Sequence, residues 1–164
     1  RCTSRGLGDV YKRQQKKIKI ESNDCMGTLE KKMMSKSGEI VLKTINAVMT
    51  GKITPIKQLR NTNLKKAPKL NKENTKIDWK QSGLRISNFV KGLNPKPCAW
   101  TYVFFGNVKL KAKIKEIYYE NCEPSGECGI IIENKKKLIV NVVDGIIYIN
   151  EIHLEGKKLS LIHI

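Results

Sequence analysis

Histidine is scarce in this chain, and the side chains of common catalytic centres do not form their usual patterns. Of the two histidines among 164 residues, only His153 lies before the last five positions. A general base that works near neutral pH is most often histidine, but His153 lies in an apolar run with Glu151 as its acidic neighbour, so we expect a surface histidine. No Gly-rich phosphate loop, Ser/His/Asp order or cluster of carboxylates is present. We therefore expect no complete catalytic centre in this chain.

Acidic residues are also scarce. The chain has 15 Asp and Glu against 32 Lys and Arg, a formal net charge of +17. Such a charge attracts polyanions and predicts nucleic acid or an anionic membrane surface as a partner. After residue 14 the basic residues are nearly all lysine, and Ile and Asn are abundant, as an AT-rich genome would also produce. The placement of the lysines is therefore more informative than their number.

Neither the cysteines nor the apolar runs show the spacing of a metal site or a membrane span. The cysteines after residue 14 lack C-x-x-C spacing, and a zinc site needs four ligands, so we expect free thiols in a reducing cytosol and no metal. These cysteines are Cys25, Cys98, Cys122 and Cys128. No apolar run approaches the roughly 20 residues that span a bilayer, and no signal peptide is visible. We expect a soluble, cytoplasmic, monomeric protein with no membrane partner.

The two ends of the chain show no periodicity that joins them to their neighbours. RCTSRGLGDVYKRQ at 1–14 and SLIHI at 160–164 have the character of translated sequencing-adapter read-through, which is left out of fold reasoning. We therefore expect the chain to be a fragment of a longer protein. A natural basic N-terminal arm is the alternative.

Between residues 15 and 51 the pattern changes from strand-like to helical. The alternation in KKIKIES is typical of a strand end. Apolar residues then recur at helical spacing and predict an amphipathic helix over 28–49, with Gly51 as its C-cap and Gly38 as a candidate break. Since nothing N-terminal to this helix is large enough to cover its apolar face, we expect its partner layer to be missing.

The remaining chain predicts a linker, a second helix and a series of strands. Residues 52–77 contain two prolines and seven lysines, with too few apolar residues for a core, and are expected to form an extended linker. A helix then begins near Ser82 as N-cap and ends before Pro95. Period-two runs follow at 99–105, 108–119, 129–133, 138–143 and 146–154. The predicted fold class is α+β: an N-terminal helical remnant and extended linker, followed by a helix and a five-stranded OB-like β-barrel.

The sharpest local pattern is an alternation of lysine and aliphatic residues in the run 108–119. Alternation places the lysine side chains on one strand face and the aliphatic side chains in the barrel. Four like charges in register repel one another unless phosphates or counter-ions neutralise them. We favour phosphate contact, and an ordinary solvated face that protects the strand edge is the alternative. The lysines are Lys109, Lys111, Lys113 and Lys115.

Aromatic side chains could add base stacking, as in barrels that bind single strands. They are few and mixed in phase, so we expect most of them in core or rim packing and no stacking platform. They are Trp79, Trp100, Tyr102, Phe104, Tyr118 and Tyr119.

Residues 67–101 resemble the linker and the start of the C-terminal domain of the methionyl-tRNA formyltransferase family. The shared pattern is APKL, then IDW, then a helix and LNPKPCAWT, where the family has LNPxPGAWT. Further segments resemble the family in the same order: NDCMGTLEKKM at 23–33, GKITPI at 51–56 and DGIIYINEIHLEGKK at 144–158. The resemblance covers residues 15–159.

The resemblance implies a division of the chain. Residues 15–51 would be the C-terminal remnant of a catalytic domain, 52–77 a lysine-rich linker and 78–159 an OB-like barrel domain, between the terminal segments 1–14 and 160–164. Cys98 departs from the family's Gly, and a non-Gly residue resists positive φ. Cys25 stands where Thr is usual, and Arg85 replaces the acidic residue that would complete a capping box with Ser82.

The resemblance also implies a function. The family transfers a formyl group from 10-formyltetrahydrofolate, its co-substrate, to the methionine amino group of initiator methionyl-tRNA. Its catalytic Asn, His and Asp and its folate-binding residues lie upstream of the matched segments, so no catalytic or cofactor-binding residue carries over and this chain alone is expected to be inactive. What carries over is tRNA contact by Lys65, Lys66, Lys69, Lys109, Lys111, Lys113 and Lys115.

Two other functions stay open. One is a free-standing OB-like module that binds nucleic acid without an attached enzyme. The other is a related formyltransferase that acts on a sugar nucleotide.

Overall fold

The structure is a computed structural model and describes residues 11–12, 14–57, 67–124, 126–134 and 137–155. The chain divides into two compact units. The first takes in the described parts of 1–22 and 28–68, and the second those of 23–27 and 69–164.

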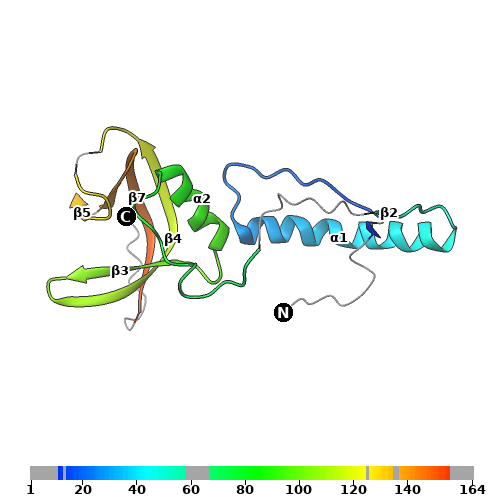
Figure 1. Cartoon of the computed structure of the whole chain (residues 1–164), viewed down its shortest axis with the longest axis horizontal. Coiled ribbons are helices and arrows are strands. Elements are labelled where there is room, and N and C mark those ends of the chain that lie inside the picture. The colour runs from blue at the N-terminus through cyan, green and yellow to red at the C-terminus, as the bar shows by residue number, and fades with distance from the viewer. Residues whose placement is uncertain (1–10, 13, 58–66, 125, 135–136, 156–164) are drawn as a thin grey trace. The chain divides into compact units, whose positions relative to one another are not determined.

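A long helix, α1, Met26–Met49, confirms the predicted helix and runs through Gly38 without a break (Figure 1). From Thr28 onward it is the main element of the first unit. No residue of α1 is buried, and its apolar side chains, such as Leu42 and Val48, lie exposed. The strand end predicted in KKIKIES is wrong, because residues 16–22 join no ladder among the described residues. A two-residue strand, β1 (Tyr11–Lys12), instead pairs antiparallel with β2 (Ile56–Lys57).

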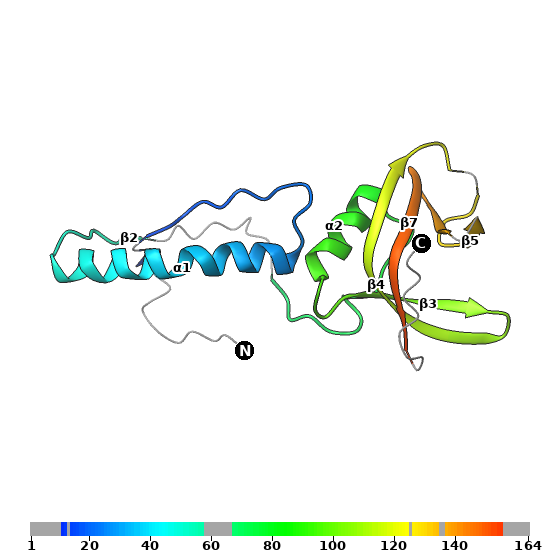
Figure 2. The same ribbon diagram turned by 180° about the vertical axis from the view of Figure 1, so that it is seen from behind.

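The second unit is one helix packed against a curled five-stranded antiparallel sheet, which confirms the α+β class (Figures 1 and 2). The strand order is β3-β4-β7-β6-β5. Among the described residues β3 and β5 form the two edges, so the barrel-like curl does not close through a β3–β5 ladder. The elements are α2 (Gly83–Leu93), β3 (Ala99–Phe105), β4 (Val108–Asn121), β5 (Ile131–Asn134), β6 (Lys137–Val142) and β7 (Gly145–Leu154).

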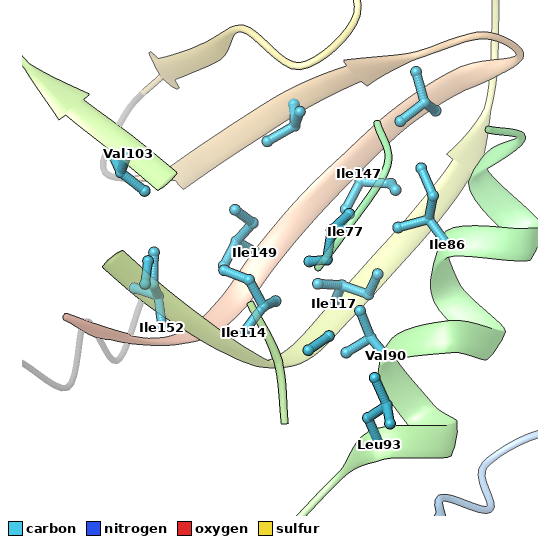
Figure 3. Packing of buried hydrophobic residues seen from close by; sticks show 14 residues of the cluster. Ile77, Ile86, Val90, Leu93, Val103, Ile114, Ile117, Ile147, Ile149 and Ile152 are labelled. Atoms are coloured by element: carbon cyan, nitrogen blue, oxygen red, sulfur yellow. The ribbon is translucent and has the colours of Figure 1, made fainter. Parts of the chain in front are cut away.

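One hydrophobic core joins α2 to the inner face of the sheet (Figure 3). Ile86, Val90 and Leu93 recur at helical spacing on one face of α2 and meet the alternating inward residues of β7, such as Ile147. Ile114 and Ile117 of β4 are both buried although three positions separate them. Strict alternation would turn one of them outward, and the register shift between these residues restores the inward orientation.

The turn between β6 and β7 holds the N-terminus of α2. The Gly83 N–H donates to Asp144 Oδ1 at 2.6 Å, and the Tyr119 hydroxyl donates to the Asp144 carbonyl oxygen at 3.1 Å. Ser82 is the N-cap as predicted, but its side chain makes no capping hydrogen bond. The carboxylate that accepts a hydrogen bond from the first turn of α2 is instead that of Asp144, 61 positions away in the sequence.

Residues 69–77, placed by sequence in the linker, pack against the sheet. Asn71 Oδ1 accepts from the backbone N–H groups of Glu73 and Asn74, both at 2.9 Å, and forms a turn. The Ile77 N–H then donates to the Trp100 carbonyl oxygen, and the Trp100 N–H donates to the Thr75 carbonyl oxygen. Thr75 and Ile77 are buried, so this segment lies beside the first half of β3.

Candidate nucleic-acid interface

The β3–β4 hairpin carries lysine and aromatic side chains on its outer face in facing rows. The antiparallel register places Lys113 opposite Trp100, Lys111 opposite Tyr102 and Lys109 opposite Phe104. Directly opposed residues point to the same side of a sheet. Ala112 and Ile114 lie on the other face and are fully buried, which confirms the predicted alternation there. Val108 differs, since it lies near the hairpin tip and is exposed.

The lysines of β4 do not have equivalent surroundings. Lys115 Nζ lies 2.6 Å from Glu151 Oε1 on β7, a hydrogen-bonded ion pair, and Lys111 Nζ lies 3.8 Å from Glu155 Oε2. No ion pair within 4.0 Å is found for Lys109 or Lys113 among the acidic groups that the structure describes. Lys109 and Lys113 are exposed and are therefore the β4 cations most available to an anionic partner.

Three aromatic side chains of β3 stand in this lysine surface. Trp100 and Tyr102 contact each other edge to face, with ring centroids 5.1 Å apart and an interplanar angle of 87°. Phe104 and Tyr118 are 65% and 59% exposed, so the expectation of core or rim packing is wrong for these two, while Tyr102, 38% exposed, lies at the rim. Trp79 and Tyr119, in contrast, pack against the core as expected.

Lysine ammonium groups lie over these rings. Lys109 Nζ is 4.0 Å from the Tyr102 ring centroid, and Lys111 Nζ is 5.0 Å from that of Trp100. Lys76 Nζ lies within 6 Å of both centroids. Cation and ring attract each other at such distances. Charge and aromatic surface are therefore combined in one place, a feature that the sequence predictions missed because they treated the six aromatic residues as one set. Taken alone, Trp100, Tyr102 and Phe104 alternate with period two.

The structure places one of the three predicted linker lysines. Lys69 is exposed, and its carbonyl oxygen accepts a hydrogen bond from Asn74 Nδ2 at 2.8 Å at the start of the 71–74 turn. Lys65 and Lys66 lie outside the described residues.

His153 lies on β7 directly opposite Lys113 and is partly buried rather than a simple surface side chain. Its Nε2 atom is buried and has no hydrogen-bond partner among the described residues. No group of three His, Cys, Asp or Glu side chains in the described part of the chain could hold a metal ion.

Cys98 stands where the family has Gly, and its backbone adopts a conformation that favours glycine. Its φ is +70°, in the left-handed region that favours glycine. The side chain is buried, and the thiol donates to the Pro95 carbonyl oxygen at 2.9 Å. Burial raises the pKa of the Cys98 thiol, against the opposing effect of Lys115 and Lys113. The thiol is therefore neutral at physiological pH and does not add a negative charge to the lysine surface.

Of the helices that the structure describes, none has the length and apolar character to cross a membrane.

Comparison with known protein families matches residues 69–163 to the formyl transferase C-terminal domain. Similar curated proteins include the methionyl-tRNA formyltransferase of Flavobacterium johnsoniae, 36% identical over 141 residues, which are 86% of this chain and 45% of that protein. The methionyl-tRNA formyltransferase of Thermodesulfovibrio yellowstonii is 36% identical over 145 residues, 88% of this chain and 44% of its own. The chain thus spans a little under half the length of these relatives.

Among solved structures, HypX from Aquifex aeolicus in complex with tetrahydrofolic acid is similar with a TM-score of 0.51 and 21% identity. The match covers 73% of this chain and 20% of that protein. At this identity the likeness concerns the fold alone.

Proposed function

Because the chain belongs to the formyl transferase C-terminal domain family, we propose that it is the tRNA-binding C-terminal part of a methionyl-tRNA formyltransferase. The complete protein would formylate the methionine amino group of initiator tRNA in the cytoplasm, with 10-formyltetrahydrofolate as formyl donor. Its catalytic and folate-binding residues would lie in the part of the relatives that this chain does not span. The chain itself would supply RNA binding and no chemical step.

The outer lysine face of β4 is the observation that carries this proposal. Its side chains point away from the core, and the formal net charge of +17 provides a long-range attraction for a polyanion. Lys109 and Lys113 would make the strongest phosphate contacts, since no ion pair is found for either among the described residues. Lys111 and Lys115 would contribute less, because an RNA phosphate must compete with Glu155 and Glu151 for them. The segment before the sheet would provide three further phosphate contacts, Lys65, Lys66 and Lys69.

The exposed apolar side chains of α1 support a larger parent protein over a free-standing module. A helix with one apolar stripe normally buries it against another layer, and α1 buries no residue. This agrees with relatives that are more than twice as long as the matched region.

The proposal is tested by measuring the affinity of the chain for initiator tRNA when two strand lysines are neutralised. Lys109→Gln with Lys113→Gln should weaken binding and reduce the log–log salt slope by about 2, since each phosphate contact contributes about 1. The matched control, Lys31→Gln with Lys80→Gln, removes the same charge from exposed positions elsewhere and should leave most of the affinity.

Equal losses in the two double variants would contradict the assignment of the β4 face. A nucleotide sugar added as competitor should not displace the tRNA. Displacement at low competitor concentration would favour the sugar-nucleotide formyltransferase instead.

A further inference from the structure

Beside Trp100 the outer surface of the second unit forms a hollow of about 440 Å³. Its walls come from the 70–75 segment, from residues 97–98 before β3, and from β3 and β4. They include Lys72, Thr75, Trp100, Lys111 and Lys113. Small-molecule sites commonly have volumes of about 300–1,000 Å³, so the hollow has room for a nucleotide. Three lysines and one indole ring in its wall combine positive charge with a flat apolar surface.

The Trp100 ring is held in position at this hollow. Its Nε1–H donates to the Lys72 carbonyl oxygen at 2.8 Å, and its backbone N–H donates to the Thr75 carbonyl oxygen at 3.1 Å. The ring also contacts that of Tyr102 at nearly a right angle, with centroids 5.1 Å apart. A ring fixed in this way loses little conformational freedom when a ligand stacks on it, which favours binding.

A nucleotide base can take the place of a lysine ammonium group above these rings. Stacking of a base on an aromatic ring is worth more than an exposed cation–π contact, so a base can replace the Lys111 ammonium group above Trp100. The displaced ammonium group, together with Lys113 from the opposite position on β4, then lies near the phosphate of the same nucleotide. Lys72 provides a third cation at the wall of the hollow.

We propose that this hollow binds one unpaired nucleotide of an RNA chain, with its base stacked on Trp100 and its phosphate between Lys72 and Lys113. The inference deepens the proposed function and rests on it for the identity of the polymer. A base inside a duplex has both faces covered by its neighbours, whereas an unpaired base can be splayed out onto a side chain. The site therefore selects a single-stranded or terminal nucleotide, whereas phosphate contact alone would not distinguish it from a paired one.

The test uses tryptophan fluorescence of the whole chain. The chain has two tryptophans, so Trp79→Phe leaves Trp100 as the only indole. Single-stranded oligouridylate should quench its emission with a saturable curve, and an RNA duplex of the same length should quench it little. Adenosine monophosphate tests a free nucleotide as the ligand, and we expect it to bind at least tenfold more weakly than the oligomer because it lacks the neighbouring phosphates.

Two substitutions locate the site. In the otherwise unchanged chain, Trp100→Leu should lower the affinity for oligouridylate about tenfold, as expected for loss of one stacked base. Lys113→Gln should also lower it, while the control Lys80→Gln should leave it within about twofold. Circular dichroism of each variant separates loss of binding from loss of folding. The quenching test in the Trp79→Phe chain keeps Trp100 and so does not depend on whether the Trp100→Leu variant folds.

Three results would overturn the site: no quenching by oligouridylate, equal quenching by the duplex, or an unchanged affinity in folded Trp100→Leu. If adenosine monophosphate bound as tightly as the oligomer, the ligand of the site would be a free nucleotide and not an RNA chain. Each of these is separate from the proposed tRNA function, which fails instead if initiator tRNA shows no salt-dependent binding. Trp100 quenching with no tRNA binding would therefore support the site and contradict the function.

Discussion

Gly83, in the first turn of α2, lies close to Tyr119 of β4. A Cβ added there would overlap the ring of Tyr119, whose hydroxyl bonds to the same turn that binds the Gly83 N–H. Both the ring and the backbone are fixed by hydrogen bonds, so neither can move away at low cost. The requirement for glycine here is steric and is independent of backbone dihedral angles.

Gly83→Ala should therefore destabilise the protein by about 1–3 kcal/mol, the usual cost of forcing extra atoms into a packed region. Gly92→Ala in the same helix is the matched control, since its added Cβ would meet nothing within 4 Å. The control should be neutral or up to about 1 kcal/mol stabilising, because alanine is the better helix former. Urea unfolding of both variants, followed by circular dichroism, makes the comparison. Equal stability of the two variants would contradict the close approach to Tyr119.

At the scale of single elements, local periodicity was sufficient to predict both helices and all five strands of the sheet within a few residues. The period of two in β4 also predicts which side chains face outward from Lys109 to Ile114, although not at Val108, which is exposed. The interactions between distant elements could not be read in this way. Asp144 reaches the first turn of α2 across 61 positions, and Lys115 pairs with Glu151 across 36. Both depend on which strands are neighbours, and a single sequence does not give the strand order.

The candidate interface was predicted only in part for a related reason. The lysine row of β4 is visible in the sequence, but its combination with Trp100 and Tyr102 requires the hairpin register. The pairing of β4 with β7 decides which lysines are neutralised, because it brings the Lys115 ammonium group within 2.6 Å of the Glu151 carboxylate. Sequence alone gives the four lysines equal weight.

Helix α1 and strand β7 should differ in stability. Helix α1 has 24 residues and buries none of them, whereas β7 carries Ile147, Ile149 and Ile152 in the core. Most helical stability in proteins comes from packing of the apolar face, and α1 lacks this contribution in the structure.

Native-state hydrogen exchange measured by mass spectrometry should therefore show fast exchange in the middle of α1 and slow exchange in β4 and β7. The difference arises because the α1 amides open without disruption of the core. Protection of α1 equal to that of β7 would mean that its apolar face is covered in solution, which would contradict the structure of the first unit.

At the scale of the whole molecule, the positive charge is the main basis of the proposed RNA binding. A basic surface binds RNA chiefly by releasing counter-ions from phosphates, and this release makes the affinity depend on salt. The Trp100 hollow adds a contact that depends on an unpaired base and is less sensitive to salt. Binding of a folded RNA by this chain should accordingly have a large electrostatic part and a smaller stacking part.

The most direct test of the central claim is the affinity of the 164-residue chain for initiator tRNA, measured by fluorescence anisotropy from about 50 to 200 mM salt. Four or more phosphate contacts predict a log–log slope of about −3 or steeper, at roughly −0.7 to −0.9 per contact. A slope near zero, or no binding at the lowest salt concentration, would contradict the claim that this chain is a tRNA-binding unit.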